Sequence, residues 1–175
     1  MSNAMTYDNP EVVNSTRSFV TFSVGKQLFG IDILLVREIN RQLDISVVPQ
    51  APNYVRGLIN LRGQIVTVLD LSLRLGRMEH PLSNQSHNII IKNETELSLL
   101  RDQQEFANLS TTHDSVGLLV DSIGEVVSAE AGDIEPPPAN MGLPDGQFVT
   151  GVLQLENHLL AILNVARILD PGKLG

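Results

Sequence analysis

The chain has 175 residues, enough for one ordinary domain or for two small β units that share a core. Its formal net charge of −8 argues against binding to a nucleic-acid backbone, and the lack of cysteine excludes disulfides and thiolate metal sites. Aromatic residues make up only 4% of the chain, so the core must consist of Leu, Ile and Val, which suits many short strands. The apolar runs are too short to span a bilayer, and we expect a cytoplasmic protein without direct membrane insertion.

The first predicted elements form a hairpin followed by a short helix. Apolar and polar residues alternate in Phe19–Val24, which predicts a strand with one buried face, and Gln27–Ile31 returns as its partner. Asp32 then stands where a helix cap belongs, so the pattern predicts a short helix over Ile33–Ile39.

The clearest hairpin of the sequence lies at residues 57–69. Its arms are Gly57–Leu61 and Gln64–Leu69, and Arg62 and Gly63 form its corner. Asp70 follows directly and is predicted to cap another short helix, so we interpret it as a structural residue rather than a catalytic one.

Residues 93–114 are polar and interrupt the series of strands. Leu97, Leu100, Phe106 and Leu109 give this segment a weakly amphipathic pattern, which fits either a helix or a mobile loop. Strands resume after it, and the chain ends in a hairpin and a helix, in this order: Ser115–Val120, Ile123–Val127, Gln147–Leu155, His158–Leu163 and Asn164–Leu169.

The two halves of the chain are similar to each other. Tyr54–Leu75 matches Phe148–Leu169 without a gap at a shift of 94 residues, and the match pairs Gly57 with Gly151. A second match, at a shift of 87 residues, lies upstream of the first one. The similarity is either a coincidence between two hairpins or the trace of a duplication.

A duplication predicts two β units, about 18–85 and 86–170, within one folded region of 18–170. Each unit alone has little core, and closure into small barrels would remove exposed strand edges. The sequence leaves open whether strands are exchanged between the units. We interpret 1–17 as an expression-tag remnant with a flexible lead-in, and 171–175 as a tail.

No pattern typical of catalysis or metal binding is present. The four histidines do not stand at metal-ligand spacing, and the sequence has neither a glycine-rich phosphate loop nor a serine elbow. We therefore expect no enzyme activity, no metal site and no cofactor.

Four blocks of the chain resemble the CheW family of bacterial chemotaxis adaptors. The stretch VRGLINLRGQIVTVLDL is similar to the most specific motif of that family, with Thr67 where the family usually has proline. The polar segment 93–114 is a second departure, because the family usually has a short connection there. In chain order, the blocks are Phe19–Ile39, Val55–Leu71, Gly117–Val127 and Gly151–Leu169.

The resemblance implies two five-stranded SH3-like barrels packed together with short helices, an all-β fold. It also implies an adaptor without catalytic activity that couples methyl-accepting chemoreceptors to the regulatory domain of the histidine kinase CheA, at receptor arrays of the inner membrane. By position in the family motifs, Val36, Glu38, Arg62 and Gly63 are expected to contact receptor or kinase. Four other residues are expected to serve the structure: Gly57, Asn60, Asp70 and Gly151.

Two alternatives stay open at this point. The chain fits an adaptor of another chemosensory pathway, such as twitching motility, equally well. It also fits a small-ligand sensor that uses the seam between the units as a pocket, although scarce aromatic residues count against this.

Overall fold

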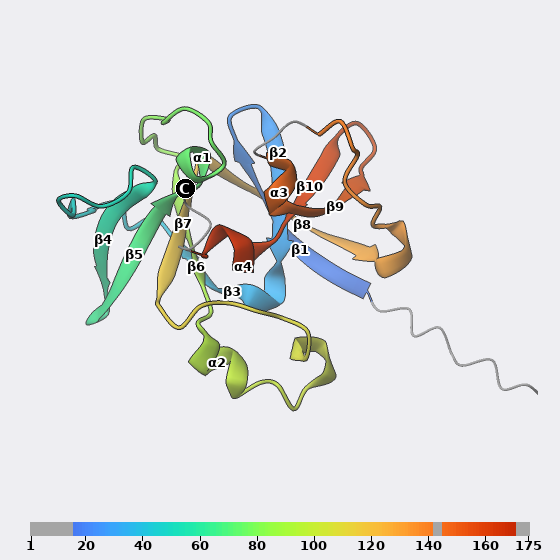
Figure 1. Cartoon of the computed structure of the whole chain (residues 1–175), viewed down its shortest axis with the longest axis horizontal. Coiled ribbons are helices and arrows are strands. Elements are labelled where there is room, and N and C mark those ends of the chain that lie inside the picture. The colour runs from blue at the N-terminus through green and yellow to red at the C-terminus, as the bar shows by residue number, and fades with distance from the viewer. Residues whose placement is uncertain (1–15, 142–144, 171–175) are drawn as a thin grey trace, which may run out of the picture.

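The computed structural model describes residues 16–141 and 145–170 (Figure 1). The described chain forms two five-stranded sheets joined by short connections and single helical turns, which confirms the predicted all-β fold. The predicted tail 171–175 and most of the lead-in lie outside the described residues.

One sheet, called the first sheet, has the strand order β8-β1-β2-β10-β9. Its strands come from both ends of the chain: β1 (Thr16–Val24), β2 (Gln27–Asp32), β8 (Ser122–Glu130), β9 (Val149–Gln154) and β10 (Leu159–Leu163). The second sheet has the order β3-β6-β7-β5-β4 and comes from the middle of the chain. Its strands are β3 (Val36–Asn40), β4 (Val55–Leu61), β5 (Gln64–Asp70), β6 (His87–Ile91) and β7 (Val116–Val120).

Short helical elements connect these strands. The α-helices are α1 (Leu71–Arg74), α2 (Glu94–Ser98), α3 (Asp145–Phe148) and α4 (Val165–Ile168). The 3-10 turns are η1 (Ile33–Leu35), η2 (Gln104–Phe106) and η3 (Ala131–Asp133).

The hairpins β4–β5 and β9–β10 have the same register when one is shifted by 94 residues. Gly57 lies opposite Val68 and Gly151 opposite Ile162, and both hairpins have an irregularity next to this pair. The second strand of each hairpin also has a parallel neighbour outside the hairpin: β5 pairs with β7, and β10 pairs with β2. These matches support the predicted duplication, which stays an inference from sequence and topology.

The strands are not divided between the sheets in chain order. β1 and β2 pair with strands of the last third of the chain, whereas β3 to β7 pair only among themselves. If the chain is a duplication, its two units have therefore exchanged strands, the arrangement that the sequence left open.

Both sheets contribute to one apolar core. Phe22 and Phe29 of the first sheet stack with ring centroids 6.2 Å apart, and they belong to the same buried cluster as Ile89 and Leu118 of the second sheet. Burial of this shared seam is the main force that holds the two sheets together.

Arg74 of α1 forms a polar link between the two sheets. Its side chain is buried and donates hydrogen bonds to the main-chain oxygens of Ile168 (2.7 Å), Arg167 (3.1 Å) and Asp170 (3.1 Å) at the end of α4. The guanidinium also lies over the Phe148 ring at 4.8 Å. Burial lowers the pKa of Arg74 from its ordinary value, which the nearby Asp170 partly offsets.

The helix predicted over Ile33–Ile39 is wrong beyond its first turn. Asp32 does cap a turn, because its Oδ1 accepts a hydrogen bond from Leu34 N at 2.9 Å, but this turn is η1 and ends at Leu35. The chain then enters β3, where Ile39 pairs with Ile89 of β6. Pairing with β6 outweighs the local helical pattern, and Val36 and Ile39 are β-branched residues that fit a strand.

Candidate functional site

The corner of the β4–β5 hairpin presents Arg62 to solvent. Arg62 and Gly63 both have positive φ angles, of 51° and 85°, as a two-residue hairpin turn of the primed type requires. Gly63 N donates to Oδ1 of Asn60 at 2.8 Å, which holds the turn. The side chain of Arg62 is 72% exposed.

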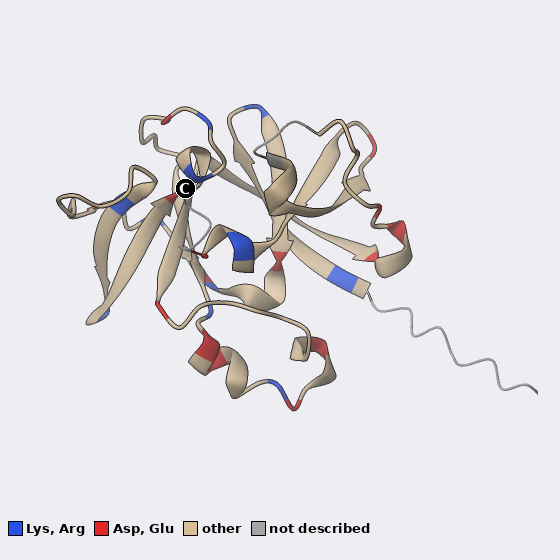
Figure 2. Cartoon of the chain, in the orientation of Figure 1, with Lys and Arg blue, Asp and Glu red and all other residues tan. Residues whose placement is uncertain are grey.

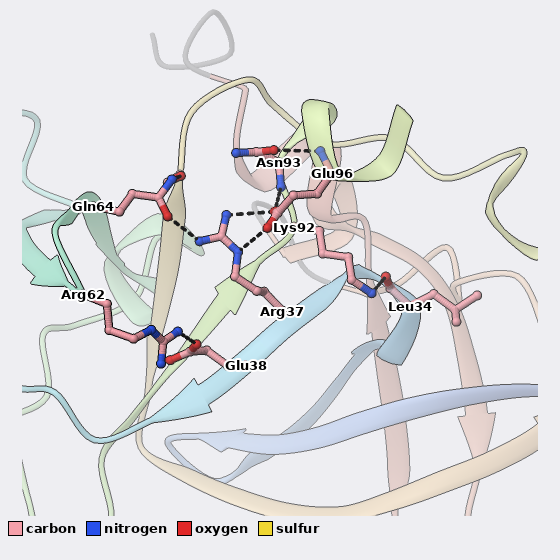
Figure 3. A network of polar contacts seen from close by, with 9 residues as sticks. Leu34, Arg37, Glu38, Arg62, Gln64, Lys92, Asn93 and Glu96 are labelled. Atoms are coloured by element: carbon pink, nitrogen blue, oxygen red, sulfur yellow. Dashed lines mark hydrogen bonds and ion pairs between the residues drawn. The ribbon is translucent and has the colours of Figure 1, made fainter. Parts of the chain in front are cut away.

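Arg62 forms an ion pair with Glu38 of β3 (Figure 3). Glu38 is partly buried, with a side chain 23% exposed, and its Oε1 also accepts a hydrogen bond from Asn40 Nδ2 at 2.9 Å. The structure thus brings together two of the residues that the sequence assigns to partner contact, 24 positions apart. Val36 lies two residues before Glu38 on the same strand and packs partly buried against the shared core.

The pKa of Glu38 lies below its ordinary value of 4.5 because its carboxylate accepts hydrogen bonds, first from Asn40 and then from Arg62. We expect Asn40→Ala and Arg62→Gln each to raise this pKa, because each removes a hydrogen bond to the carboxylate. Because the folded-state pKa is lowered, the stabilisation is present above the unfolded-state pKa and is lost as the pH falls through the folded-state value. An NMR titration of the Glu38 carboxyl carbon measures the shift in each variant, and an unchanged pKa in both variants would contradict this prediction.

Of the four residues expected to be structural, Asn60 holds the turn beside Arg62, and the other three lie in other parts of the fold. Gly57 has a φ of 146°, and a Cβ there would stand 2.1 Å from Ser46 O. A Cβ at Gly151 would stand 2.7 Å from Cγ2 of Ile134. Asp70 caps α1, since its Oδ1 accepts from Leu73 N at 3.1 Å.

The departures from the family pattern lie close to each other. Thr67, where the resemblance leads us to expect proline, donates its N–H to Ser115 O at 3.0 Å, next to the end of the segment 93–114. This segment, called the extension below, forms α2 and η2 and buries Leu97 and Phe106 in the shared core. The sequence allowed either a helix or a mobile loop in this segment, and the structure contains short helical elements there.

Sequence reasoning missed Arg37. This residue of β3 forms an ion pair with Glu96 of α2, with Nε 2.7 Å from Oε1, and donates to Gln64 Oε1 of β5 at 3.0 Å (Figure 3). The Asn93–Glu96 spacing is a visible signal for α2, because it matches a capping box. Nothing local in the sequence indicates that Arg37 meets Glu96.

Three further findings concern other kinds of site and function. A pocket of about 170 Å³ lies between β5, β7 and α4, which is small beside the roughly 300–1,000 Å³ of ordinary ligand sites. In the described ranges 16–141 and 145–170, no three His, Asp or Glu side chains gather as metal ligands would. None of the helices described is long and apolar enough to cross a membrane.

The comparisons with known proteins agree on one family. The sequence model of the CheW-like domain matches residues 18–172. The chain is 31% identical to the chemotaxis protein CheW of Rhizobium meliloti (strain 1021) over 161 residues, which cover 92% of each chain. It is 26% identical to that of Treponema pallidum (strain Nichols) over 166 residues, covering 94% of this chain and 89% of the relative.

Among solved structures, the fold is similar to that of the scaffolding protein TtCheW from Thermoanaerobacter tengcongensis. The TM-score is 0.71 at 28% sequence identity, and the match covers 88% of this chain and 92% of the other. The relatives are chemotaxis proteins, which favours neither the twitching-motility alternative nor the ligand sensor. From its sequence and its fold, the chain belongs to the family of CheW-like domains and is a chemotaxis adaptor.

Proposed function

We propose that this adaptor couples the cytoplasmic tips of methyl-accepting chemoreceptors to the regulatory domain of the histidine kinase CheA, and that the Arg62–Glu38 pair belongs to its contact surface. The observation that carries the site is the exposed Arg62 held in place by Glu38 at a hairpin corner. An arginine fixed by an ion pair loses less side-chain entropy when a partner binds, and arginine is enriched among the residues that dominate interface energies.

Apolar side chains accompany the ion pair on the same strands. Ile39 of β3 is 38% exposed and Ile65 of β5 is 57% exposed. Apolar area supplies affinity in a protein interface, whereas charges at its rim set the partner and its register. Exposed apolar and charged side chains in this part of the second sheet suit reversible contact with another protein.

In this function the adaptor forms and breaks no covalent bond. It acts at the cytoplasmic side of receptor arrays, where the receptor presents a helical tip and the kinase a folded domain. Signalling then depends on which kinase geometry the assembly favours. Helix binding in an apolar groove and docking of a strand-rich face are both established modes of recognition.

The charge reversal Arg62→Glu tests this proposal. We expect its affinity for the cognate kinase regulatory domain, measured by titration calorimetry, to fall roughly 30-fold or more, because the variant places two carboxylates where an ion pair stood. A parallel titration with the cytoplasmic tip of the cognate receptor shows which partner uses this face.

Lys26→Glu is the matched control, since it makes the same charge change at the exposed β1–β2 turn of the first sheet. Its affinities should stay within about twofold of the wild type, as for a charge outside the interface. If Arg62→Glu binds both partners like the wild type, the site assignment is wrong. If the wild type binds neither partner, the coupling function itself is wrong.

A further inference from the structure

Arg37 lies between two of the candidate contact residues but is directed away from solvent. Its side chain is only 16% exposed. The guanidinium contacts Glu96 of the extension through two nitrogens, with Nη2 2.8 Å from Oε2 in addition to the Nε contact. A cation that is covered and neutralised in this way is not available to a partner, so its role is internal.

The anion that Arg37 meets is itself fixed. Glu96 Oε2 accepts from Asn93 N at 2.8 Å, while Asn93 Oδ1 accepts from Glu96 N at 3.0 Å, so both residues close a capping box at the start of α2. Glu94 N donates to Thr112 O at 2.8 Å and joins the two ends of the extension. The carboxylate therefore stands at a defined position over β3.

The extension is anchored in the shared core rather than lying over it as a lid. Leu97 is fully buried and Phe106 is 6% exposed. Lys92, which precedes the extension, donates an Nζ hydrogen to Leu34 O at 2.8 Å (Figure 3). Its Nζ also lies 5.4 Å from the Phe106 ring centre. Moving α2 would expose this apolar surface, so α2 is a fixed support.

The other contact of Arg37 reaches the hairpin that carries Arg62. Gln64 follows the Arg62–Gly63 corner directly, and its Nε2 donates to Ser115 Oγ at 2.8 Å. Arg37 thus joins three parts of the molecule: the strand with Glu38, the hairpin with Arg62 and the extension with Glu96 (Figure 3).

We propose that Arg37 is a positioning residue through which the extension 93–114 holds the Glu38–Arg62 face in its partner-binding geometry. This inference rests on the proposed function, because it concerns the same face. It assigns a role to the segment that departs from the family pattern. The extension is also acidic, as Figure 2 shows for α2, and Arg37 is the β3 cation that ties this charge to the second sheet.

The test is the affinity of Arg37→Gln for the cognate kinase regulatory domain and receptor tip. For the partner that uses the Arg62 face, we expect about a tenfold loss, the size of a coupling between contacting charged groups. The double variant Arg37→Gln/Glu96→Gln should lose no more affinity than Arg37→Gln alone, because both changes break the same contact and Gln can still close the capping box. Two independent effects on folding do not predict this lack of additivity.

Arg101→Gln is the matched control, because it removes an arginine that pairs with Glu94 inside the same extension without touching β3. Its affinities should stay within about twofold of the wild type. If Arg37→Gln is unfolded by circular dichroism, Glu96→Gln tests the same contact from the other side.

Three results would overturn the inference: wild-type affinity in Arg37→Gln, an equal loss in Arg101→Gln, or a loss in the double variant Arg37→Gln/Glu96→Gln that equals the sum of the two single losses in free energy. The proposed function fails separately: the coupling is wrong if the wild type binds neither partner, and the site assignment is wrong if Arg62→Glu binds both partners like the wild type.

Discussion

Replacing Gly57 with alanine should lower the free energy of unfolding by roughly 3–5 kcal/mol, a large share of the stability of a domain this size. The added Cβ would lie 2.1 Å from Ser46 O, and the φ of 146° is one that residues with a side chain rarely adopt. Ser46 cannot yield cheaply, because Ser46 N and O both bond to Leu58, each at 2.8 Å. The free-energy costs of backbone strain and of overpacking therefore add at this position.

Two other glycines separate these contributions. Gly63 has a φ of 85°, but a Cβ added there would meet no atom within 4 Å, so Gly63→Ala should cost only backbone strain, about 1–2 kcal/mol. Gly132 has neither feature, and Gly132→Ala should be nearly neutral. Urea denaturation of the three variants gives the order. A Gly57→Ala variant as stable as Gly132→Ala would contradict the argument.

Replacing Arg74 with leucine should lower the free energy of unfolding by about 3–5 kcal/mol. The substitution removes the donor for three main-chain oxygens at the end of α4. It also removes the cation between the rings of Tyr54, 5.2 Å away, and Phe148, which occupy matching positions in the internal repeat. Arg74→Lys should recover only part of the loss, because an ammonium group cannot bond all three oxygens in the same fork.

Arg167→Leu is the control for this substitution. Arg167 lies on α4 and is exposed, with one hydrogen bond to Gln147 O at 3.1 Å, so its removal should change the free energy of unfolding by about 0.5 kcal/mol or less. Thermal and urea unfolding of both variants decide the comparison. If Arg74→Leu and Arg167→Leu lose the same stability, the buried guanidinium does not join the sheets as described.

The parts of the fold that could be predicted from sequence are those with a local signal. The β4–β5 hairpin follows from apolar alternation around the Arg62–Gly63 corner, and the Asp70 cap follows from its place before a leucine-rich turn. The repeat predicted similar hairpins, and their registers match at the predicted shift. These features depend on neighbours a few residues away.

The errors and omissions concern contacts made at long range. The local pattern after Asp32 fits a helix, but in the folded chain these residues form β3 and pair with β6. The Arg37–Glu96 pair joins residues 59 positions apart, so no window of sequence contains it. Gly57 and Gly151 occupy equivalent positions in the repeat, but of these two glycines only Gly57 has a positive φ. These differences arise from tertiary structure.

The way the chain is shared between the sheets has a consequence for its synthesis. Every strand of the second sheet has been synthesised once residue 120 is made, because β3 to β7 are contiguous. The β1–β2 hairpin is translated first, yet its neighbours β8 and β10 emerge last. The core around Phe22 and Phe29 of this hairpin is therefore incomplete until the last strands are made, which leaves apolar surface exposed on the nascent chain.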